Sequence, residues 1–487
     1  MSAKQMLCYG LYLLLAVLQL LVPQSEAAIA WEAMTFEAKD GTRVPAQRGT
    51  LEVPLRHDDA ASGTTTLAFV KFNATTDNPG PPIIYLAGGP GGSGIATAKG
   101  ARFELFMALR SVADVIALDQ RGTGASAPPP PCQAPEAYPI DQPLLREPWI
   151  AYLRATAVHC GAVWREQGVD LNAYTTWESA GDLEALRQAL GAQKVSLWGI
   201  SYGTHLAMAA VRRMEPHLHR LVLASPEGLA QTIKLPLRSD RFYDRVAEVI
   251  ARDPEAAARY PDLTATMRKV LERLDSSPID VDLVAPGAEG SVTLTLDGTA
   301  ARLYTAFFLS KNPHNIAALP AFYAALAEGE YEYLAQAAYR LAYARPAALR
   351  PMSLAMDLAS GVCADRLALI EQQADEAILQ DWLNYPLPHL LGVLDNVQDL
   401  GEEFRAPLRS SLPTLILSGT LDGRTFPEAH QEVLSQFSQG AMVTIENAGH
   451  DLFMIDPRVG DIVQAFLAGS TPTRERIVIP PPSFQQY

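Results

Sequence analysis

The sequence is short of positive charge, of cysteine and of long apolar stretches. Its 487 residues include 39 Lys and Arg against 54 Asp and Glu, which gives a formal net charge of −15. Nucleic acids and anionic membranes bind basic patches, so this balance argues against both as main partners. Hydrophobic residues make up 48% and charged residues only 19%, which excludes a disordered chain. The length suits two or three domains, or one large domain with an insertion.

One apolar run lies at the start of the chain. Lys4 precedes a run over residues 6–22, which a polar segment then ends. A basic start, a short apolar stretch and small residues after it are typical of a secretory signal peptide, which we predict over residues 1–30. The alternative is a membrane anchor, but the run is short for a helix that must cross roughly 30 Å of hydrocarbon. We expect an exported protein, secreted or periplasmic, without a membrane partner once the signal is cut after Ala27, Ala28 or Ala30.

Three cysteines remain after the predicted signal peptide: Cys132, Cys160 and Cys363. An oxidising compartment permits disulfides, and Cys132 and Cys160 lie in one loop-rich region. We predict a bridge between these two, the alternative being three free thiols. Three cysteines at these spacings do not suggest a zinc site, and no other metal or cofactor is implied.

Short apolar runs alternate with helical patterns through much of the chain. Two alternating stretches, residues 49–55 and 65–73, predict antiparallel strands. Later runs are apolar throughout, as in parallel strands buried on both faces; they cover residues 82–86, 114–118, 194–198, 220–224, 413–418 and 441–445. The clearest helices are predicted at residues 176–190, where Thr175 and Glu178 can form a capping box, and at residues 459–467. Strands alternating with helices predict an α/β fold with a mostly parallel sheet.

This alternation is interrupted between residues 230 and 404. There the chain is mostly an Ala- and Leu-rich helical pattern, with one hairpin element at residues 291–296. We interpret the segment as a helical cap inserted into a core of residues 31–229 and 405–470, which an extended tail over residues 471–487 follows.

The pattern Gly-x-Ser-x-Gly at residues 199–203 joins a predicted strand to a predicted helix. A sharp strand-to-helix turn needs glycines, because side chains there would collide with neighbouring backbone. The turn exposes the hydroxyl of Ser201 at the carboxyl edge of the sheet, where open α/β sheets bind ligands. Ser201 is therefore the candidate nucleophile.

A serine nucleophile needs a base to take its proton and a carboxylate to orient that base. His450 and Asp422 each follow a predicted strand, so both lie at the same edge as Ser201. The order Ser201, Asp422, His450 is the one expected of an α/β-hydrolase. The alternative is that Asp422 and His450 only cap loops. The other histidines are predicted to pack or to lack a catalytic context: His57, His159, His205, His217, His219, His314, His389 and His430.

Acyl transfer also needs donors for the oxyanion. The backbone N–H of Tyr202, next to the nucleophile, is one candidate, and the glycine-rich loop after the strand at residues 82–86 is the other source. Pro90 has no N–H, so Gly89 is the first choice there and Gly91 the reserve. The alternative, a phosphate-binding loop, lacks the lysine and the spacing that such loops carry.

Five segments together carry a family resemblance: GGPGGS, DQRGTG, GISYGT, SGTLD and GH, at residues 88–93, 119–124, 199–204, 418–422 and 449–450. In this order they resemble the proline iminopeptidase and tripeptidyl aminopeptidase family of serine peptidases, over nearly the whole chain after the signal. Tyr202 and the export signal resemble the tripeptidyl branch. Ala87 departs from proline iminopeptidases, which have histidine there. The resemblance implies the α/β-hydrolase fold and structural roles for Asp119 and Arg121.

An aminopeptidase must hold an ammonium group at a fixed distance from its nucleophile, and a carboxylate in a partly dry pocket is the natural partner. Glu227 follows the strand at residues 220–224 and so emerges at the edge of Ser201. Asp365 lies in a segment that resembles a cap segment of the tripeptidyl branch, where an acidic residue stands near a cysteine. The alternative for each is a solvated or helix-capping charge.

These patterns predict an exported serine exopeptidase that forms an acyl-enzyme on Ser201 and releases residues from the free amino terminus of small peptides, of the prolyl or the tripeptidyl type. A carboxylesterase on the same fold is the alternative, because fold and triad leave the leaving group open. A non-catalytic binding module is a third hypothesis, and the complete triad argues against it.

Overall fold

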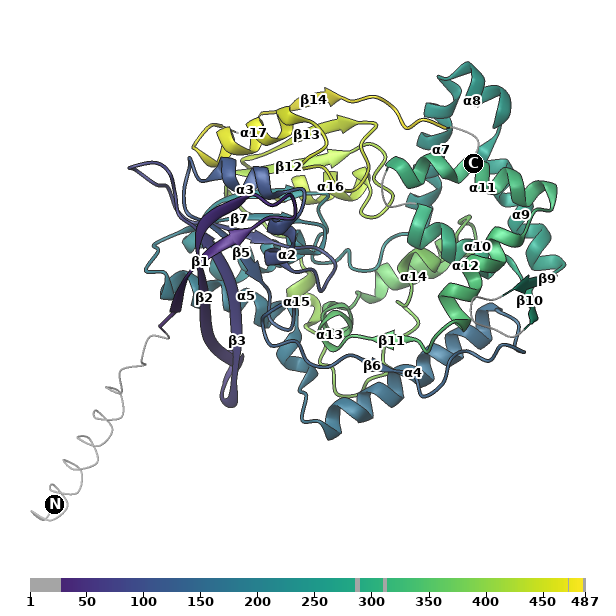
Figure 1. Ribbon diagram of the computed structural model, residues 1–487, viewed down its shortest axis with the longest axis horizontal. Helices are drawn as coiled ribbons and strands as arrows, with labels where there is room; N and C mark the ends of the chain where they lie inside the picture. The colour runs from purple at the N-terminus through teal and green to yellow at the C-terminus, as the bar shows by residue number, and fades with distance from the viewer. Residues whose placement is uncertain (1–27, 285–289, 310–312, 472, 485–487) are drawn as a thin grey trace, which may run out of the picture.

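A computed structural model of the chain describes residues 28–284, 290–309, 313–471 and 473–484 (Figure 1). Most of the predicted signal peptide, residues 1–27, lies outside the described residues, and the signal stays a prediction. The first strand, β1 (Ala30–Glu37), begins at the last of the predicted cleavage positions.

One sheet of ten strands organises the protein, in the order β1-β2-β3-β5-β4-β7-β8-β12-β13-β14. The first three strands, and β3 with β5, pair antiparallel, and from β5 to β14 neighbouring strands pair parallel. The strands after β1 are β2 (Arg43–Arg56), β3 (Asp59–Phe72), β4 (Ile83–Leu86), β5 (Val115–Asp119), β7 (Val195–Ile200), β8 (Leu218–Ala224), β12 (Thr414–Gly419), β13 (Gly440–Glu446) and β14 (Glu475–Val478). The predicted mostly parallel sheet is confirmed, and every predicted strand overlaps an observed one.

Both faces of the parallel strands are buried. In β4, for example, Ile84 and Leu86 pack into one core, whereas Ile83 and Tyr85 pack into the other, because successive side chains of a strand point to opposite faces. Helices α2 (Gly94–Lys99), α3 (Phe103–Leu109) and α17 (Pro457–Leu467) lie on the Tyr85 side; α5 (Thr176–Ala189), α6 (Tyr202–Met214) and α16 (Pro427–Leu434) lie on the other. This burial explains why the strands are apolar throughout.

The capping box predicted at the start of α5 forms only in part. The side chain of Thr175 accepts a hydrogen bond from the N–H of Glu178, at 3.3 Å. The carboxylate of Glu178 accepts instead from the N–H of His57, at 2.6 Å, because the turn between β2 and β3 brings that amide to the helix.

The predicted tail adds an edge strand to the sheet. β14 pairs parallel with β13, and the side-chain amide of Asn447 donates to the carbonyl of Ile479, at 2.8 Å. Asn447 lies in the loop that leads from β13 to His450. The tail therefore supports the loop that carries the candidate base.

Between β8 and β12 the chain is mainly helical and lies beside the sheet, with α9 to α12 farthest from it (Figure 1). The predicted hairpin element is confirmed, because β10 pairs antiparallel with β9. Among the described residues no helix has both the length and the apolar character that crossing a bilayer demands. The elements are α7 (Leu237–Ala251), α8 (Pro254–Arg259), α9 (Leu263–Ser276), β9 (Ile279–Val284), β10 (Ser291–Leu296), α10 (Gly298–Tyr304), η4 (Thr305–Leu309), α11 (Pro313–Glu328), α12 (Glu332–Ala338), η5 (Tyr339–Tyr343), β11 (Ala348–Leu349), α13 (Pro351–Ser360), α14 (Ala364–Ala374), η6 (Trp382–Asn384) and α15 (Gly401–Arg405).

The segment that contains β6 and α4, which precedes β7 in the sequence, packs against this insertion. β6 (Cys132–Gln133) pairs antiparallel with β11, and α4 (Arg146–Glu166) is held by an ion pair between Arg146 and Asp381, at 2.8 Å. Both elements lie in the segment predicted as core, residues 31–229. Their contacts run to the insertion, so a boundary at residue 229 does not separate core from cap.

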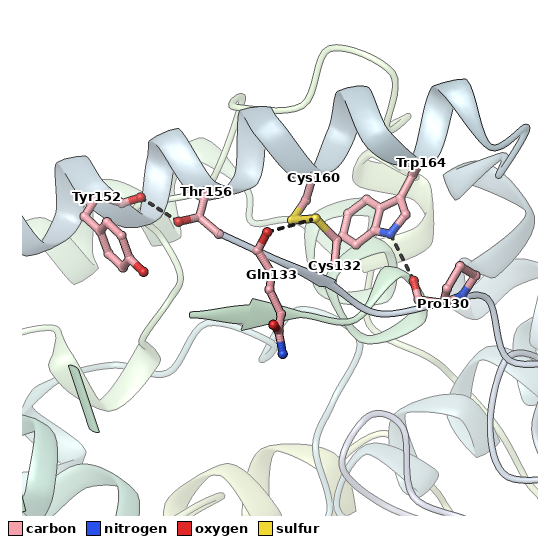
Figure 2. The surroundings of a disulfide bond; sticks show 7 residues. All are labelled: Pro130, Cys132, Gln133, Tyr152, Thr156, Cys160 and Trp164. Carbon is pink, nitrogen blue, oxygen red and sulfur yellow. Dashed lines mark hydrogen bonds between the residues drawn. A yellow bond between two sulfur atoms is a disulfide. The ribbon is translucent and has the colours of Figure 1, made fainter. Parts of the chain in front are cut away.

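The predicted disulfide between Cys132 and Cys160 is present, with the two Cα atoms 5.5 Å apart. Figure 2 shows Cys160 and Trp164 pointing from α4 toward the segment that contains Cys132. The indole N–H of Trp164 donates to the carbonyl of Pro130, at 3.1 Å. Because β6 pairs with β11, which directly precedes α13, the bridge ties α4 to the approach to α13.

Replacing both Cys132 and Cys160 with serine is expected to lower the free energy of unfolding by about 2–4 kcal/mol, because the bridge restricts the unfolded chain. Denaturant unfolding of the two proteins measures the difference. Cys363→Ser is the matched control, since Cys363 is free and only partly buried, and it should leave stability nearly unchanged. Intact masses after thiol alkylation that are the same with and without reductant would show that the bridge is absent.

Candidate active site

Ser201 occupies a turn that only its glycine neighbours permit. β7 ends at Ile200 and α6 begins at Tyr202, which leaves Ser201 between them with a φ of 54°. A Cβ atom at Gly199 would lie 2.7 Å from the carbonyl oxygen of Gly203, and one at Gly203 would lie 2.1 Å from that of Leu86. Side chains cannot fit at either glycine, and the strained backbone projects the serine at the strand end.

Asp422 follows β12 and is fully buried. Its carboxylate accepts hydrogen bonds from the N–H groups of Arg424 and Thr425, at 2.8 and 3.1 Å, and lies 3.0 Å from the hydroxyl of Thr425. Burial alone would raise the pKa of Asp422, but the adjacent His450 and the Arg424 amide hold that pKa well below its usual range. The carboxylate is therefore ionised at neutral pH.

His450 follows β13, and its Nδ1 lies 3.0 and 3.1 Å from the two carboxylate oxygens of Asp422. Because the carboxylate only accepts, Nδ1 carries the proton, and Nε2 is left as the acceptor that a general base needs. The hydroxyl of Ser225 donates to the carbonyl of His450, at 2.7 Å, and so fixes the loop. Among the residues that the structure describes, Ser201 Oγ forms no hydrogen bond, an arrangement that is common before substrate binds.

Strained backbone gathers around these strand ends. Besides Ser201, three non-glycine residues there have positive φ: Ser225 at 46°, Phe426 at 60° and Asn447 at 68°. They follow β8, which neighbours β7, and β12 and β13, which precede Asp422 and His450. Strain of this kind persists where the surrounding structure enforces it, which is typical of active sites.

The glycine-rich loop after β4 packs directly on the nucleophile turn. A Cβ atom at Gly88 would lie 3.0 Å from the Cβ of Ser201, so the loop approaches closely only because a side chain is lacking. Within the described residues the N–H of Gly89 has no hydrogen-bond partner. Tyr202 is the first residue of α6, where an amide lies outside the helical hydrogen-bond ladder. Gly89 and Tyr202 thus remain the candidate oxyanion donors.

Asp119 and Arg121 hold the surrounding loops. The carboxylate of Asp119 accepts from the hydroxyl of Ser93, at 2.5 Å, and from the N–H groups of Ile95 and Ala125, at 3.0 and 2.8 Å. Arg121 is fully buried and pairs with Asp182, while it donates to backbone carbonyls of β2 and of the segment before α5. These contacts are those of the structural roles that the resemblance implied.

Helix α13 of the insertion crosses the loop and α6. The hydroxyl of Ser353 donates to the carbonyl of Pro90, at 3.0 Å, and Ser360 Oγ lies 3.1 Å from Nε2 of His205 on α6. Asp357 is one turn beyond Ser353 and therefore on the same side of the helix. Burial, reinforced by the negative charge of the nearby Glu227, raises the pKa of Asp357 to about 7. In the described part of the chain no hydrogen bond or ion pair engages this partly buried carboxylate.

The two residues predicted to hold an amino terminus have different surroundings. Glu227 is buried beside α6, where its N–H donates to the hydroxyl of Thr204, at 2.8 Å, but its carboxylate is paired with Lys234 Nζ, at 3.0 Å. Asp365 is exposed in the first turn of α14. The structure therefore brings Glu227 to the site together with Asp357, which the sequence analysis missed, and it leaves Asp365 on the surface. The only sequence signal for Asp357 is that it is the one charged residue in the apolar helix α13.

Sequence reasoning also gave His430 no catalytic context, and the structure corrects this. His430 is fully buried, with Nδ1 2.8 Å from the hydroxyl of Ser418 and Nε2 3.0 Å from the hydroxyl of Thr425. Nε2 also lies 3.7 Å from a carboxylate oxygen of Asp422. The position of His430 depends on how α16 packs against β12, which no local motif records.

Known proteins resemble this chain in sequence and in fold. A family model described as alpha/beta hydrolase fold matches residues 81–457. Serine protease Hip1 of Mycobacterium tuberculosis is 30% identical over 235 residues, which are 46% of this chain and 44% of that protein. A tripeptidyl aminopeptidase of Streptomyces coelicolor is 29% identical over 216 residues, 41% of this chain and 38% of the relative. The matched region spans less than half the length of these curated relatives.

A further relative and two solved structures complete the comparison. A proline iminopeptidase of Xanthomonas citri is 29% identical over 180 residues, 37% of this chain and 39% of the relative. The crystal structure of a proline iminopeptidase-related protein from Thermus thermophilus has 18% identity and a TM-score of 0.39, and it covers 86% of this chain and 97% of its own. A thermophilic esterase from Thermogutta terrifontis has 17% identity and a TM-score of 0.35, with 90% and 98% covered.

Proposed function

Because this chain belongs to the alpha/beta hydrolase fold family, we propose that it is a serine peptidase in which Ser201 is the nucleophile, His450 the general base and Asp422 the carboxylate that orients His450. The observation that carries the proposal is the contact between His450 Nδ1 and the buried carboxylate of Asp422, at 3.0 Å, at the edge where the Ser201 turn ends β7. The peptidase names of the curated relatives support peptides as substrates.

In the proposed reaction Ser201 Oγ attacks the scissile carbonyl carbon while His450 Nε2 takes the hydroxyl proton. The N–H groups of Gly89 and Tyr202 stabilise the negative oxygen of the tetrahedral intermediate. His450 then gives the proton to the leaving amine, the C–N bond breaks and an acyl ester on Ser201 remains. A water molecule, deprotonated by His450, hydrolyses that ester and restores the serine.

We further propose that the enzyme is an exopeptidase and that Asp357 receives the amino terminus of the peptide. Lys234 is paired with Glu227, whereas no hydrogen bond or ion pair of the described structure engages the partly buried carboxylate of Asp357, on which Glu227 and Lys234 act only through their charges. An ammonium group supplies the missing counter-charge, and charge-assisted hydrogen bonds in such surroundings are strong. We therefore assign to Asp357 the role that the sequence predicted for Asp365, because Asp365 is exposed.

Asp357→Asn is expected to raise KM for peptides with a free amino terminus by about 10- to 100-fold, the worth of a hydrogen bond between charged groups. The effect depends on pH: above about 7 the carboxylate of Asp357 is ionised, and above about 8 a terminal amine loses its proton. Steady-state kinetics of the parent protein should therefore show KM falling as pH rises to 7 and rising again beyond 8. In Asp357→Asn the fall of KM up to pH 7 should be absent.

The exposed Asp365 provides the matched control, because Asp365→Asn should leave KM unchanged. In the parent enzyme, acetylation of the substrate amine should have the same effect on KM as Asp357→Asn. The substitution Asp357→Asn should not change the hydrolysis of simple esters without an amine. Equal hydrolysis of acetylated and free peptides would exclude the amino-terminal site and favour the carboxylesterase or an endopeptidase.

A panel of aminoacyl amides, tripeptidyl amides and simple esters tests the function as a whole. Hydrolysis of amides with a free amine, faster than that of esters matched in their acyl part, supports the exopeptidase. Rapid ester hydrolysis without any amide hydrolysis would establish the esterase, and inactivity toward every substrate would leave the binding module as the interpretation.

We also propose that the protein is exported. The apolar run at residues 6–22 supports this, and so does the bridge between Cys132 and Cys160, because disulfides persist in oxidising compartments. Amino-terminal sequencing of the protein recovered outside the cytoplasm tests it. A start near Ala28 is expected, and a mature protein that retains Met1 in the cytoplasm would contradict export.

A further inference from the structure

A series of hydrogen-bonded side chains leads from Ser418 of β12, through His430 of α16, to the carboxylate of Asp422. Ser418 Oγ lies 2.8 Å from His430 Nδ1, His430 Nε2 lies 3.0 Å from Thr425 Oγ1, and Thr425 Oγ1 lies 3.0 Å from an oxygen of Asp422. All four side chains are buried, with at most 3% of any residue exposed. Water does not reach these groups in bulk, so each must satisfy its hydrogen bonds within the chain.

Counting protons gives the chain a direction. Asp422 is an ionised carboxylate and the strongest acceptor within reach of the Thr425 hydroxyl, so the hydroxyl proton is directed to it. The oxygen of Thr425 then accepts from His430, which places the His430 proton on Nε2. His430 Nδ1 is left as an acceptor, and the hydroxyl of Ser418 donates to it. Every donor in the series therefore points toward the carboxylate.

We propose that His430 is a positioning residue that acts on Asp422 through the hydroxyl of Thr425 and thereby tunes the base His450. The proposal rests on the proposed function of Asp422 and His450. The hydroxyl of Thr425 has a competing acceptor, the carbonyl of Ser225 at 3.1 Å. Donation from His430 polarises the hydroxyl of Thr425 and makes it a better donor, and the charged carboxylate of Asp422 is a stronger acceptor than the neutral carbonyl of Ser225.

The charges around His430 keep the ring neutral, as this arrangement requires. Glu428 on the same helix is paired with Arg245 of α7, at 2.7 Å. Asp422 and His450 face the ring from the strand ends. Burial outweighs the attraction of Asp422 and lowers the pKa of His430 to about 4. A neutral ring with one N–H is therefore present over the pH range in which a serine hydrolase works.

The series affects His450 because the Thr425 hydroxyl and His450 share the carboxylate of Asp422. Hydrogen bonds in a row polarise one another, and they are strong where water is excluded. With Thr425 donating, part of the negative charge of Asp422 is already stabilised, so the carboxylate holds a protonated His450 less strongly. Loss of the donation should strengthen that hold and move the acidic limb of the rate profile to higher pH.

Two substitutions of His430 separate this role from packing. The amide nitrogen of glutamine reaches the position of Nε2, so His430→Gln can still donate to Thr425. The amide of asparagine reaches only the position of Nδ1, so His430→Asn keeps a polar group near Ser418 and loses the donor. We expect His430→Asn to lower kcat/KM about three- to tenfold, the worth of one hydrogen bond, and to shift the acidic limb upward, whereas His430→Gln restores both.

Thr425→Val removes the intermediate hydroxyl with little change of volume and should shift the limb in the same direction. In the Thr425→Val background, His430→Asn should add no further shift, because the two residues act in series. Thr425→Ser keeps the hydroxyl and is the control. If His430→Asn fails to fold, Thr425→Val and Thr425→Ser carry the test alone.

The pH profiles are measured with an activated ester as well as a peptide amide. If the protein hydrolyses the ester but not the amide, the peptidase is refuted, and the effect of His430 on His450 can still be measured with the ester. The titration of His450, followed by NMR of protein with ¹⁵N-labelled histidine, gives a readout independent of turnover. An unmoved limb and an unmoved titration in both His430→Asn and Thr425→Val would overturn the proposal. Equal losses in His430→Asn and His430→Gln, or additive shifts in the double variant, would overturn it as well.

Discussion

Ser201→Ala is expected to lower kcat by about 10⁶-fold, to the rate left by binding and the oxyanion donors, since the members of such a triad act as a unit. Without the hydroxyl no acyl-enzyme can form. Folding should be unaffected, because Ser201 Oγ forms no hydrogen bond within the described structure and alanine is compatible with the space there. Circular dichroism and denaturant unfolding check the fold, and steady-state kinetics with the best amide substrate check the loss.

An organophosphonate should label the same residue. One adduct is expected per chain, on the peptide that contains Ser201, and none in Ser201→Ala. Ser276, at the exposed end of α9, is the matched control: Ser276→Ala should be labelled and should turn over substrate at the parent rate. Parent-like turnover in Ser201→Ala would end the serine-nucleophile hypothesis, whatever the labelling.

Asp422→Asn is expected to lower kcat by about 10⁴-fold, as in other triads. The asparagine amide can donate, so it stabilises the form of His450 that has its proton on Nε2, which cannot accept from Ser201. The same change removes the negative charge that balances a protonated His450 during turnover. Kinetics at saturating substrate measure the loss, and KM should change little because Asp422 is buried away from substrate.

The neighbouring carboxylate Asp451 is the control for this variant. It follows His450 directly, is paired with Arg102 at 2.7 Å, and is 63% exposed in its side chain. Asp451→Asn should cost less than tenfold. A small loss in Asp422→Asn together with a large one in Asp451→Asn would transfer the orienting role to Asp451.

The sequence predicted the elements whose signals are local. The strands β4, β5, β7 and β12 are buried at every residue, so their apolar runs stood out. β14 did not, because its four residues include Glu475 and Arg476 and its pairing depends on β13. The two-residue strands β6 and β11 pair across more than two hundred residues of chain, which no local pattern reports.

The same distinction holds at the site. Ser201, Asp422 and His450 each follow a strand in a recognisable turn, so their order along the chain was informative, and the structure places the last two in contact. The candidate oxyanion donors followed from the turn and the glycine loop. Asp357 and His430 lie within helices, and their relevance comes from what packs beside them. Asp365 was predicted from a resemblance alone, and it is exposed.

The position of β14 has a consequence for how the enzyme is made. Ribosomes deliver the amino end first, so β1 and the nucleophile turn leave the ribosome long before β14. A nascent chain of about 460 residues already holds all three candidate catalytic side chains, yet it lacks the strand that lies against β13 and the carbonyl of Ile479 that receives the Asn447 amide. The loop of His450 gains its outer support only after β14 has been made, so a fully ordered site follows the synthesis of that strand.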